Sequence, residues 1–200
     1  MDERTEDVSG SLLTAIAAVS MLRQEPGAKI VHNLICSWIV PETILAAGGV
    51  PVRTRVGHSF IKQVMAETGA IFGGEHSAHY YFRDNYRADS GIIAALLVLE
   101  QLSLTGQPLS ELRVPFERYA MSGEINTRVE DPLGVIEHVA ATYADAEQDR
   151  LDGLTVDFGD WWFNLRPSNT EPLLRLNLEA SDRAACDART AEVLALVRGT

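Results

Sequence analysis

The chain has 200 residues, 46% hydrophobic and 22% charged, which is typical of a globular protein with one or two domains. Its 17 Lys and Arg against 28 Asp and Glu give a net charge of −11, which argues against general nucleic-acid binding. Two cysteines exclude a disulfide scaffold and fit a reducing cytosol. The acidic start lacks the positive region of a secretory signal, and the longest apolar run, 92–99, is far short of a membrane helix. We therefore expect a cytoplasmic protein with neither a membrane nor a nucleic-acid partner.

Helices and short strands alternate along the first half of the chain. Ser9 or Ser11 can cap a first helix, which Pro26-Gly27 ends. Further helices are predicted from Pro41 to the Gly48-Gly49 pair, over 58–68, and from a cap at Asp89 or Ser90 to about 102, with strands at 28–35, 50–56, 70–72 and 80–82. This alternation predicts a mixed α/β layer domain.

The segment Thr105-Gly106-Gln107-Pro108 is the predicted boundary, dividing the chain into domains 1–108 and 109–200. The second domain is predicted to hold strands at 118–129, 153–158, 161–165 and 173–178, a helix over 132–143 capped by Asp131, and a final helix capped by Ser181. This pattern indicates a small α+β domain, with an antiparallel sheet and helices on one face.

Two arginines bracket a polar turn in an otherwise acidic second half, which has 9 basic and 17 acidic residues over 105–200. The segment Arg166-Pro-Ser-Asn-Thr-Glu-Pro172 is followed by Arg175, so Ser168, Asn169 and Thr170 lie between two guanidinium groups in sequence. Hydroxyls, turn N–H groups and guanidinium forks together form an anion pocket. The alternative is a plain hairpin turn, because the same residue types favour turns.

A second polar segment, Gly73 to His79, places a carboxylate, a hydroxyl and two imidazoles on one loop. Glu75 and Ser77 have groups that can bond to sugar hydroxyls. A metal site using Glu75, His76 and His79 is an alternative, although the spacing matches no standard zinc pattern. The second alternative is a polar surface loop without a binding role.

His58 and Ser59 stand at a strand-to-helix junction, where free N–H groups attract anions. A simple helix cap is the competing interpretation of His58. The sequence has no Walker loop, no dinucleotide fingerprint and no Gly-x-Ser-x-Gly nucleophile elbow.

Together these segments resemble the α-D-phosphohexomutases, the phosphomannomutase/phosphoglucomutase family. The stretch Gly74 to His79 resembles the sugar-recognition loop of the family's third domain, with Ala78 where Gly is usual. The stretch Arg166 to Pro172 resembles the phosphate loop of its fourth domain, and Thr54 to Lys62 resembles the segment before the sugar loop.

The resemblance implies the C-terminal half of an enzyme that moves a phosphoryl group between O1 and O6 of a hexose. The family's phosphoserine motif and magnesium loop are not in these 200 residues, so we expect the chain to be inactive alone and to hold no cofactor itself. Magnesium is expected in the domain that carries the loop, and the N-terminal half could be a separate partner chain. The alternative is a non-catalytic sugar-phosphate-binding or regulatory module.

The resemblance also assigns roles to residues of this chain. Glu75 and Ser77 would hold sugar hydroxyls, and His79 or His58 would assist proton transfer or contact phosphate. The phosphate would be held by Arg166, Ser168, Asn169 and Thr170, with Arg175 beside them. The sequence does not distinguish mannose, glucose or glucosamine phosphates as the ligand.

Overall fold

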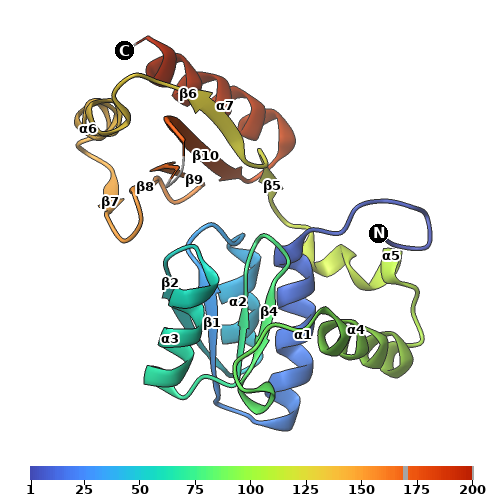
Figure 1. Cartoon of the computed structure of the whole chain (residues 1–200). Coiled ribbons are helices and arrows are strands. Elements are labelled where there is room, and N and C mark those ends of the chain that lie inside the picture. The colour runs from blue at the N-terminus through green and yellow to red at the C-terminus, as the bar shows by residue number, and fades with distance from the viewer. Residues whose placement is uncertain (169–170, 200) are drawn as a thin grey trace. The chain divides into compact units, whose positions relative to one another are not determined.

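A computed structural model describes residues 1–168 and 171–199 of the chain. They form two compact units, Met1–Arg118 and Tyr119–Thr200 (Figure 1). The division falls after Arg118 rather than after Pro108, because the segment that follows the predicted boundary packs with the first unit. The predicted fold class, a mixed α/β domain followed by an antiparallel α+β domain, is confirmed.

The first unit is built on a four-stranded mixed sheet in the order β2-β1-β3-β4. The strands are β1 (Lys29–Asn33), β2 (Val50–Thr54), β3 (Phe72–Gly74) and β4 (Tyr80–Phe82). β1 runs parallel to β2 and β3, while β4 is antiparallel to β3. The third strand thus begins at Phe72, not at Ala70 as predicted, and it ends where the polar loop begins.

Helices cover both faces of this sheet (Figure 1). Those that contact its strands are α1 (Gly10–Gln24), α2 (Ile39–Ala46) and α3 (His58–Thr68). α4 (Gly91–Thr105) packs on α1, and the short α5 (Leu109–Leu112) packs on α4; the unit also has 3-10 turns η1 (Arg83–Asn85) and η2 (Val114–Phe116). A Cβ on Gly73 would meet Ile61 of α3, and one on Gly74 would meet Thr14 of α1. Because neighbouring strand residues point to opposite faces, α1 and α3 lie on opposite sides of the sheet.

Serine hydroxyls begin two of these helices. Ser9 caps α1 by accepting from Leu12 N at 3.2 Å, and Ser90 caps α4 by accepting from Ile93 N at 3.3 Å. Of the two alternatives at each end, the structure therefore selects Ser9 and Ser90. The helix predicted to start at Pro41 starts instead at Ile39.

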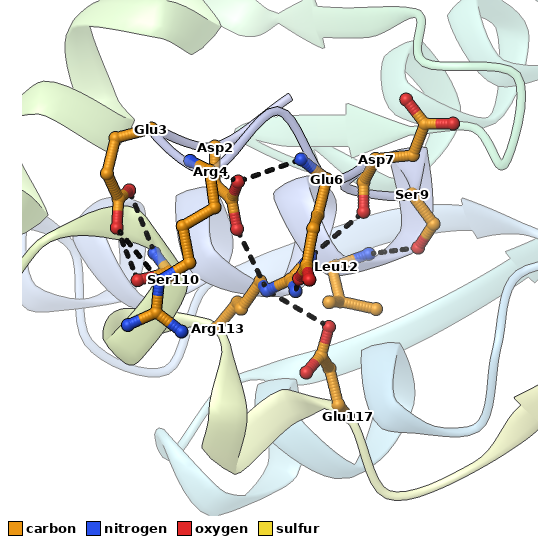
Figure 2. Close-up of polar contacts among 10 residues, drawn as sticks. All are labelled: Asp2, Glu3, Arg4, Glu6, Asp7, Ser9, Leu12, Ser110, Arg113 and Glu117. Carbon is orange, nitrogen blue, oxygen red and sulfur yellow. Dashed lines mark hydrogen bonds and ion pairs between the residues drawn. The ribbon is translucent and has the colours of Figure 1, made fainter.

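The N-terminal segment is fastened to the region after α4 by ionic contacts (Figure 2). Arg113 forms ion pairs with Glu6 and with the buried Asp2, whose Oδ2 lies 3.5 Å from Arg113 Nε. The Glu3 carboxylate accepts from the Ser110 hydroxyl and from Ser110 N at 3.2 Å. These contacts join α5 to the start of the chain, which explains why α5 belongs to the first unit.

The second unit is an antiparallel sheet in the order β5-β10-β9-β8-β7, with β6 also paired to β10. Its strands are β5 (Ala120–Met121), β6 (Ile125–Arg128), β7 (Glu147–Asp149), β8 (Leu154–Asp157), β9 (Trp161–Pro167) and β10 (Leu173–Ala180). Helices α6 (Pro132–Thr142) and α7 (Arg183–Arg198) pack on one face over a core that includes Val139, Phe163 and Val193.

Three details of this unit differ from the sequence prediction. Strand β7 was not predicted; its short sequence Glu-Gln-Asp has no apolar alternation. The final helix is capped by Asp182, which accepts from Ala185 N at 2.8 Å, and not by Ser181. The single strand predicted over 118–129 is wrong, because the segment is broken into β5 and β6.

The break between β5 and β6 is a β-bulge in the segment that pairs with β10. Met121 lies opposite Glu179 and Ile125 lies opposite Leu176, so three residues on one strand face two on the other. Gly123 supplies the left-handed backbone that the extra residue needs, with φ +70°. A bulge changes the direction in which nearby side chains point.

Across the described residues, no single helix has the length and apolar composition needed to cross a membrane. One pair of helical segments, Gly91–Thr105 and Leu109–Phe116, has the required length and apolar composition when the two are taken together, but the pair is bent by 88° at the break between them. Both members lie in the first unit.

Candidate functional site

The predicted sugar loop is a tight turn between β3 and β4, closed by its own backbone. Ala78 N donates to Glu75 O and Glu75 N donates to His79 O, both at 3.0 Å. Ala78 has φ +63°, a left-handed conformation that glycine adopts without strain. The start of α1 packs directly against the backbone of the turn. A Cβ on Gly10 would lie 2.5 Å from His76 O and 2.7 Å from Ala78 N.

The Glu75 carboxylate is the centre of a buried polar cluster and is only 3% exposed. Oε1 accepts from Gly57 N at 3.1 Å and from Asn33 Nδ2 at 3.4 Å, and Oε2 accepts from the Tyr81 hydroxyl at 2.8 Å. Burial, reinforced by the bond to Glu75, raises the pKa of Tyr81, so the hydroxyl stays a donor. Three separate segments are therefore joined at one carboxylate.

Ser77 and His79 are the exposed polar residues of the loop, on either side of the exposed Ala78. Ser77 Oγ lies 3.1 Å from His79 Nδ1, and the same nitrogen lies 3.9 Å from Glu75 Oε2. The His79 side chain is 53% exposed. The loop thus presents a hydroxyl and an imidazole above a buried carboxylate, groups that can donate to and accept from sugar hydroxyls.

His58 is the first residue of α3 and is exposed. The residue before it, Gly57, has φ +129° and donates its N–H to Glu75. The N-terminus of α3 therefore lies at the sugar loop, which brings the predicted segments 53–59 and 73–79 together. The N-cap residue is Gly57, so His58 is not the helix cap, and its role as a ligand contact stays a prediction.

Two titratable side chains beneath the loop are held uncharged by burial. Burial lowers the pKa of His32 to about 4 and raises the pKa of the Cys36 thiol to about 12. The Cys36 thiol donates to Asn33 Oδ1 at 3.2 Å, which orients the amide that bonds to Glu75. Cys36 thus helps to fix the position of Asn33, one of the donors to Glu75.

The second candidate site lies at the end of the β9–β10 hairpin. Arg166 and Arg175 are direct partners across the two strands, so their side chains share one face of the sheet. Arg175 Nη2 lies 3.4 Å from Ser168 Oγ, and Ser168 N donates to Leu173 O at 2.8 Å. The segment is thus a hairpin connection that also gathers two cations and a hydroxyl.

Glu124 connects the two arginines. Its Oε2 accepts from Arg166 Nη2 at 2.9 Å, and its Oε1 accepts from Arg175 Nη1 at 3.2 Å. Burial lowers the pKa of Arg166, an effect that the Glu124 carboxylate opposes and the Arg175 charge adds to. Of the other predicted phosphate contacts, Asn169 and Thr170 lie outside the described residues.

Sequence reasoning missed Asn33, Tyr81 and Glu124. Asn33 ends a buried strand and Tyr81 lies within one, so neither stands out from a structural residue in the sequence. Glu124 does have a signal, the Gly123-Glu124 pair that interrupts an alternating strand. Only the register of β10 shows that this interruption places a carboxylate beside Arg175.

Within residues 1–168 and 171–199, no group of three or more His, Cys, Asp or Glu side chains that could hold a metal ion comes together. His76 Nδ1 lies 3.0 Å from Ser11 Oγ, and His79 bonds to Ser77. Each imidazole of the sugar loop therefore contacts a hydroxyl.

Two family models match the chain. Residues 9–119 match phosphoglucomutase/phosphomannomutase, alpha/beta/alpha domain III, and residues 124–196 match the C-terminal domain of the same family. The chain therefore belongs to the phosphoglucomutase/phosphomannomutase family and comprises its domain III and C-terminal domain.

Relatives with curated names agree with this assignment. The chain is 46% identical to a phosphomannomutase of Salmonella montevideo over 200 residues and 43% identical to one of Methanocaldococcus jannaschii over 197 residues. Each match covers 98% of this chain and 44% of the relative. The chain thus spans less than half the length of these relatives.

Solved structures share the fold. A phosphoglucomutase/phosphomannomutase family protein from Burkholderia thailandensis superimposes with a TM-score of 0.78 at 27% identity, over 96% of this chain and 43% of that one. An Aspergillus fumigatus N-acetylphosphoglucosamine mutase, solved in complex with glucose 1,6-bisphosphate, has a TM-score of 0.67 at 15% identity, over the same shares of each chain. At that identity the second likeness concerns the fold alone.

Proposed function

We propose that this chain binds a hexose phosphate, with the sugar recognised by the loop at Glu75 and the phosphate by Arg166, Arg175 and Ser168. The observation that carries the proposal is the pair of guanidinium groups on one face of the β9–β10 hairpin, in the C-terminal domain of a phosphohexomutase family. In so acidic a chain, two directly opposed arginines need a structural or functional reason.

The phosphate end uses charge and fork geometry. A phosphate monoester carries close to two negative charges at pH 7 and three acceptor oxygens. Two guanidinium groups can each pair with its oxygens, and the Ser168 hydroxyl adds a neutral contact. We extend the proposal to Asn169 and Thr170, which follow Ser168 in the sequence.

The sugar end uses hydroxyl recognition. An ionised carboxylate offers about four acceptor positions, and three at Glu75 already accept bonds from the protein. One position remains for a sugar hydroxyl, while the exposed Ser77 and His79 supply further contacts. Glu75 in this proposal both holds the loop and reads the sugar.

The activity proposed for the whole enzyme is phosphoryl transfer between O1 and O6 of a hexose. This chain would bind and orient the sugar phosphate, and positioning is a large part of what phosphoryl transfer needs from a protein. Either His79 or His58, both exposed, would contact phosphate or move a proton.

The remaining parts of the reaction are proposed to lie outside this chain. Magnesium and the phosphoserine would be supplied by domains resembling the family's first two, in the same polypeptide or as a separate chain. On this proposal the 200 residues alone bind but do not turn over substrate, and the location is the cytoplasm.

One titration tests both sets of proposed contacts. Isothermal calorimetry or ligand-observed NMR compares wild type, Arg166→Ala and Glu75→Gln, with a hexose 6-phosphate and inorganic phosphate as ligands. Arg166→Ala should weaken the binding of both ligands by about 1.5–3 kcal/mol, because a charge-assisted contact is lost. Glu75→Gln should weaken only the hexose phosphate, because a carboxylate does not attract phosphate.

Circular dichroism on each variant is the control for folding. Unchanged affinity in Arg166→Ala would mean that the segment is only a hairpin turn. Equal losses for both ligands in Glu75→Gln would contradict the division between sugar and phosphate recognition.

A further inference from the structure

Glu124 lies where a phosphate is proposed to bind. Its two carboxylate oxygens each accept from a different guanidinium group, at 2.9 Å from Arg166 and 3.2 Å from Arg175. Two oxygens of a phosphate would make the same pair of contacts. The arginine pair thus already contacts an anion that belongs to the chain.

The β-bulge explains how Glu124 comes to lie there. One extra residue between Met121 and Ile125, accommodated by Gly123, sets the residue that follows it beside the arginine pair. Ser122 fixes the bulge to β10, with Leu178 N donating to Ser122 Oγ at 3.0 Å. The placement of the carboxylate is therefore built into the backbone.

Charge attraction favours Glu124 beside the two arginines, and its partial exposure allows it to move away. Like charges directly opposite each other on a sheet are destabilising, and the Arg166 side chain is only 10% exposed, so the pair needs an anion. The Glu124 side chain is 31% exposed and borders solvent. Both arginine Nε atoms are buried and have no hydrogen-bond partner among the described residues, so Glu124 satisfies only part of each guanidinium group.

We infer that Glu124 is an internal ligand of this pocket: its carboxylate sits between Arg166 and Arg175 while the pocket is empty, and a phosphate group binds by displacing it. The inference rests on the proposed function, because it requires phosphate to bind at these arginines. The displacement lowers phosphate affinity by a fixed amount, which also speeds release of a ligand that must turn over.

The test compares wild type, Glu124→Gln and the matched control Glu130→Gln in the full 200-residue chain. The control removes one negative charge from an exposed position in the same unit. A hexose 6-phosphate and the corresponding hexose 6-sulfate are titrated by calorimetry. These ligands share geometry and differ in charge.

Glu124→Gln should tighten binding of both ligands by roughly tenfold, about 1.4 kcal/mol. The factor should be equal for both, because the same carboxylate is displaced whatever the ligand. Glu130→Gln should change either affinity less than about twofold, about 0.4 kcal/mol. A gain in binding free energy about twice as large for the phosphate ester as for the sulfate ester would show repulsion by a carboxylate that stays in place. Weaker binding would show that Glu124 only positions the arginines. Either result overturns the inference.

Two further measurements separate the sources of failure. If Glu124→Gln does not fold, Glu124→Asp keeps the charge but is one methylene too short to bridge both arginines; it should show a smaller gain in affinity, and no gain would overturn the inference. Arg166→Ala tests the proposed function separately. If Arg166→Ala loses phosphate binding while the Glu124 variants bind as wild type does, this inference fails and the proposed function stands.

Discussion

The imidazole of His32 is buried beneath the sugar loop, and its titration should be visible in the stability of the protein. Burial lowers its pKa to about 4, whereas an unfolded histidine titrates near 6.5. Between these values the unfolded chain binds a proton that the folded chain excludes. The free energy of unfolding should therefore fall by up to about 3 kcal/mol as the pH drops from about 6.5 to 4, and this group should have no effect above that range.

Chemical denaturation at several pH values, on wild type and His32→Asn, measures this contribution. Carboxyl groups with lowered pKa values, such as Asp2 and Glu3, also lose stability in acid, but they are common to both proteins and cancel in the difference. Parallel curves for the two proteins would show that His32 does not titrate in this way.

Ala78 is strained in the sugar loop. An L-residue in the left-handed region costs about 1–2 kcal/mol, and glycine avoids that cost while losing more chain entropy, about 0.4–1 kcal/mol. Ala78→Gly should therefore stabilise the protein by about 0.5–1 kcal/mol. The matched control is Ala95→Gly on the exposed side of α4, where the same substitution should destabilise by about 1 kcal/mol. Urea denaturation of both variants decides the sign, and equal losses would remove the case for strain.

At the scale of elements, the start of α1 and the sugar loop are packed backbone against backbone. Adding a methyl group in Gly10→Ala would bring a Cβ to 2.5 Å from His76 O, so the loop or the helix must move. We expect a loss of about 1–3 kcal/mol, the usual range for overpacking, together with weaker hexose phosphate binding. Thermal unfolding and the titration described above measure the two effects.

Gly91 is the matched control for Gly10. It is also the first residue of a helix capped by serine, but a Cβ there would meet no atom within 4 Å. Gly91→Ala should change stability by less than about 1 kcal/mol and leave binding unchanged. Similar losses in the two variants would mean that helix starts in general, and not the loop contact, cause the effect at Gly10.

At the scale of the whole molecule, the chain spans two domains of a family whose matched relatives are longer. We therefore expect that ligand binding can be separated from turnover. The purified 200-residue chain should bind a hexose phosphate yet fail to convert glucose 1-phosphate into glucose 6-phosphate with magnesium present. The reason is that neither the family's phosphoserine motif nor its magnesium loop occurs in these 200 residues. A coupled dehydrogenase assay measures conversion, with a full-length phosphomannomutase as the positive control. Magnesium-dependent turnover by the pure chain would falsify this.

The sequence by itself determined most of the local elements, the fold class and the family. Helix caps act within one turn of the residues they bond, so the sequence predicts Asp131 directly and narrows the starts of α1 and α4 to two residues each. The motifs at Glu75 and Arg166 are contiguous and equally legible. Alternating helices and strands were sufficient for the fold class because layer architectures are few.

Tertiary structure alone decided which groups meet. Asn33, Gly57 and Tyr81 surround the Glu75 carboxylate because parallel pairing of β1 with β2 and β3 brings distant strand ends to one edge. The unit boundary depends on long-range ion pairs of Arg113, and the place of Glu124 depends on a one-residue bulge in the register of β10. Contacts between residues far apart in the chain arise only when the sheet forms, since strand periodicity does not specify partner or register.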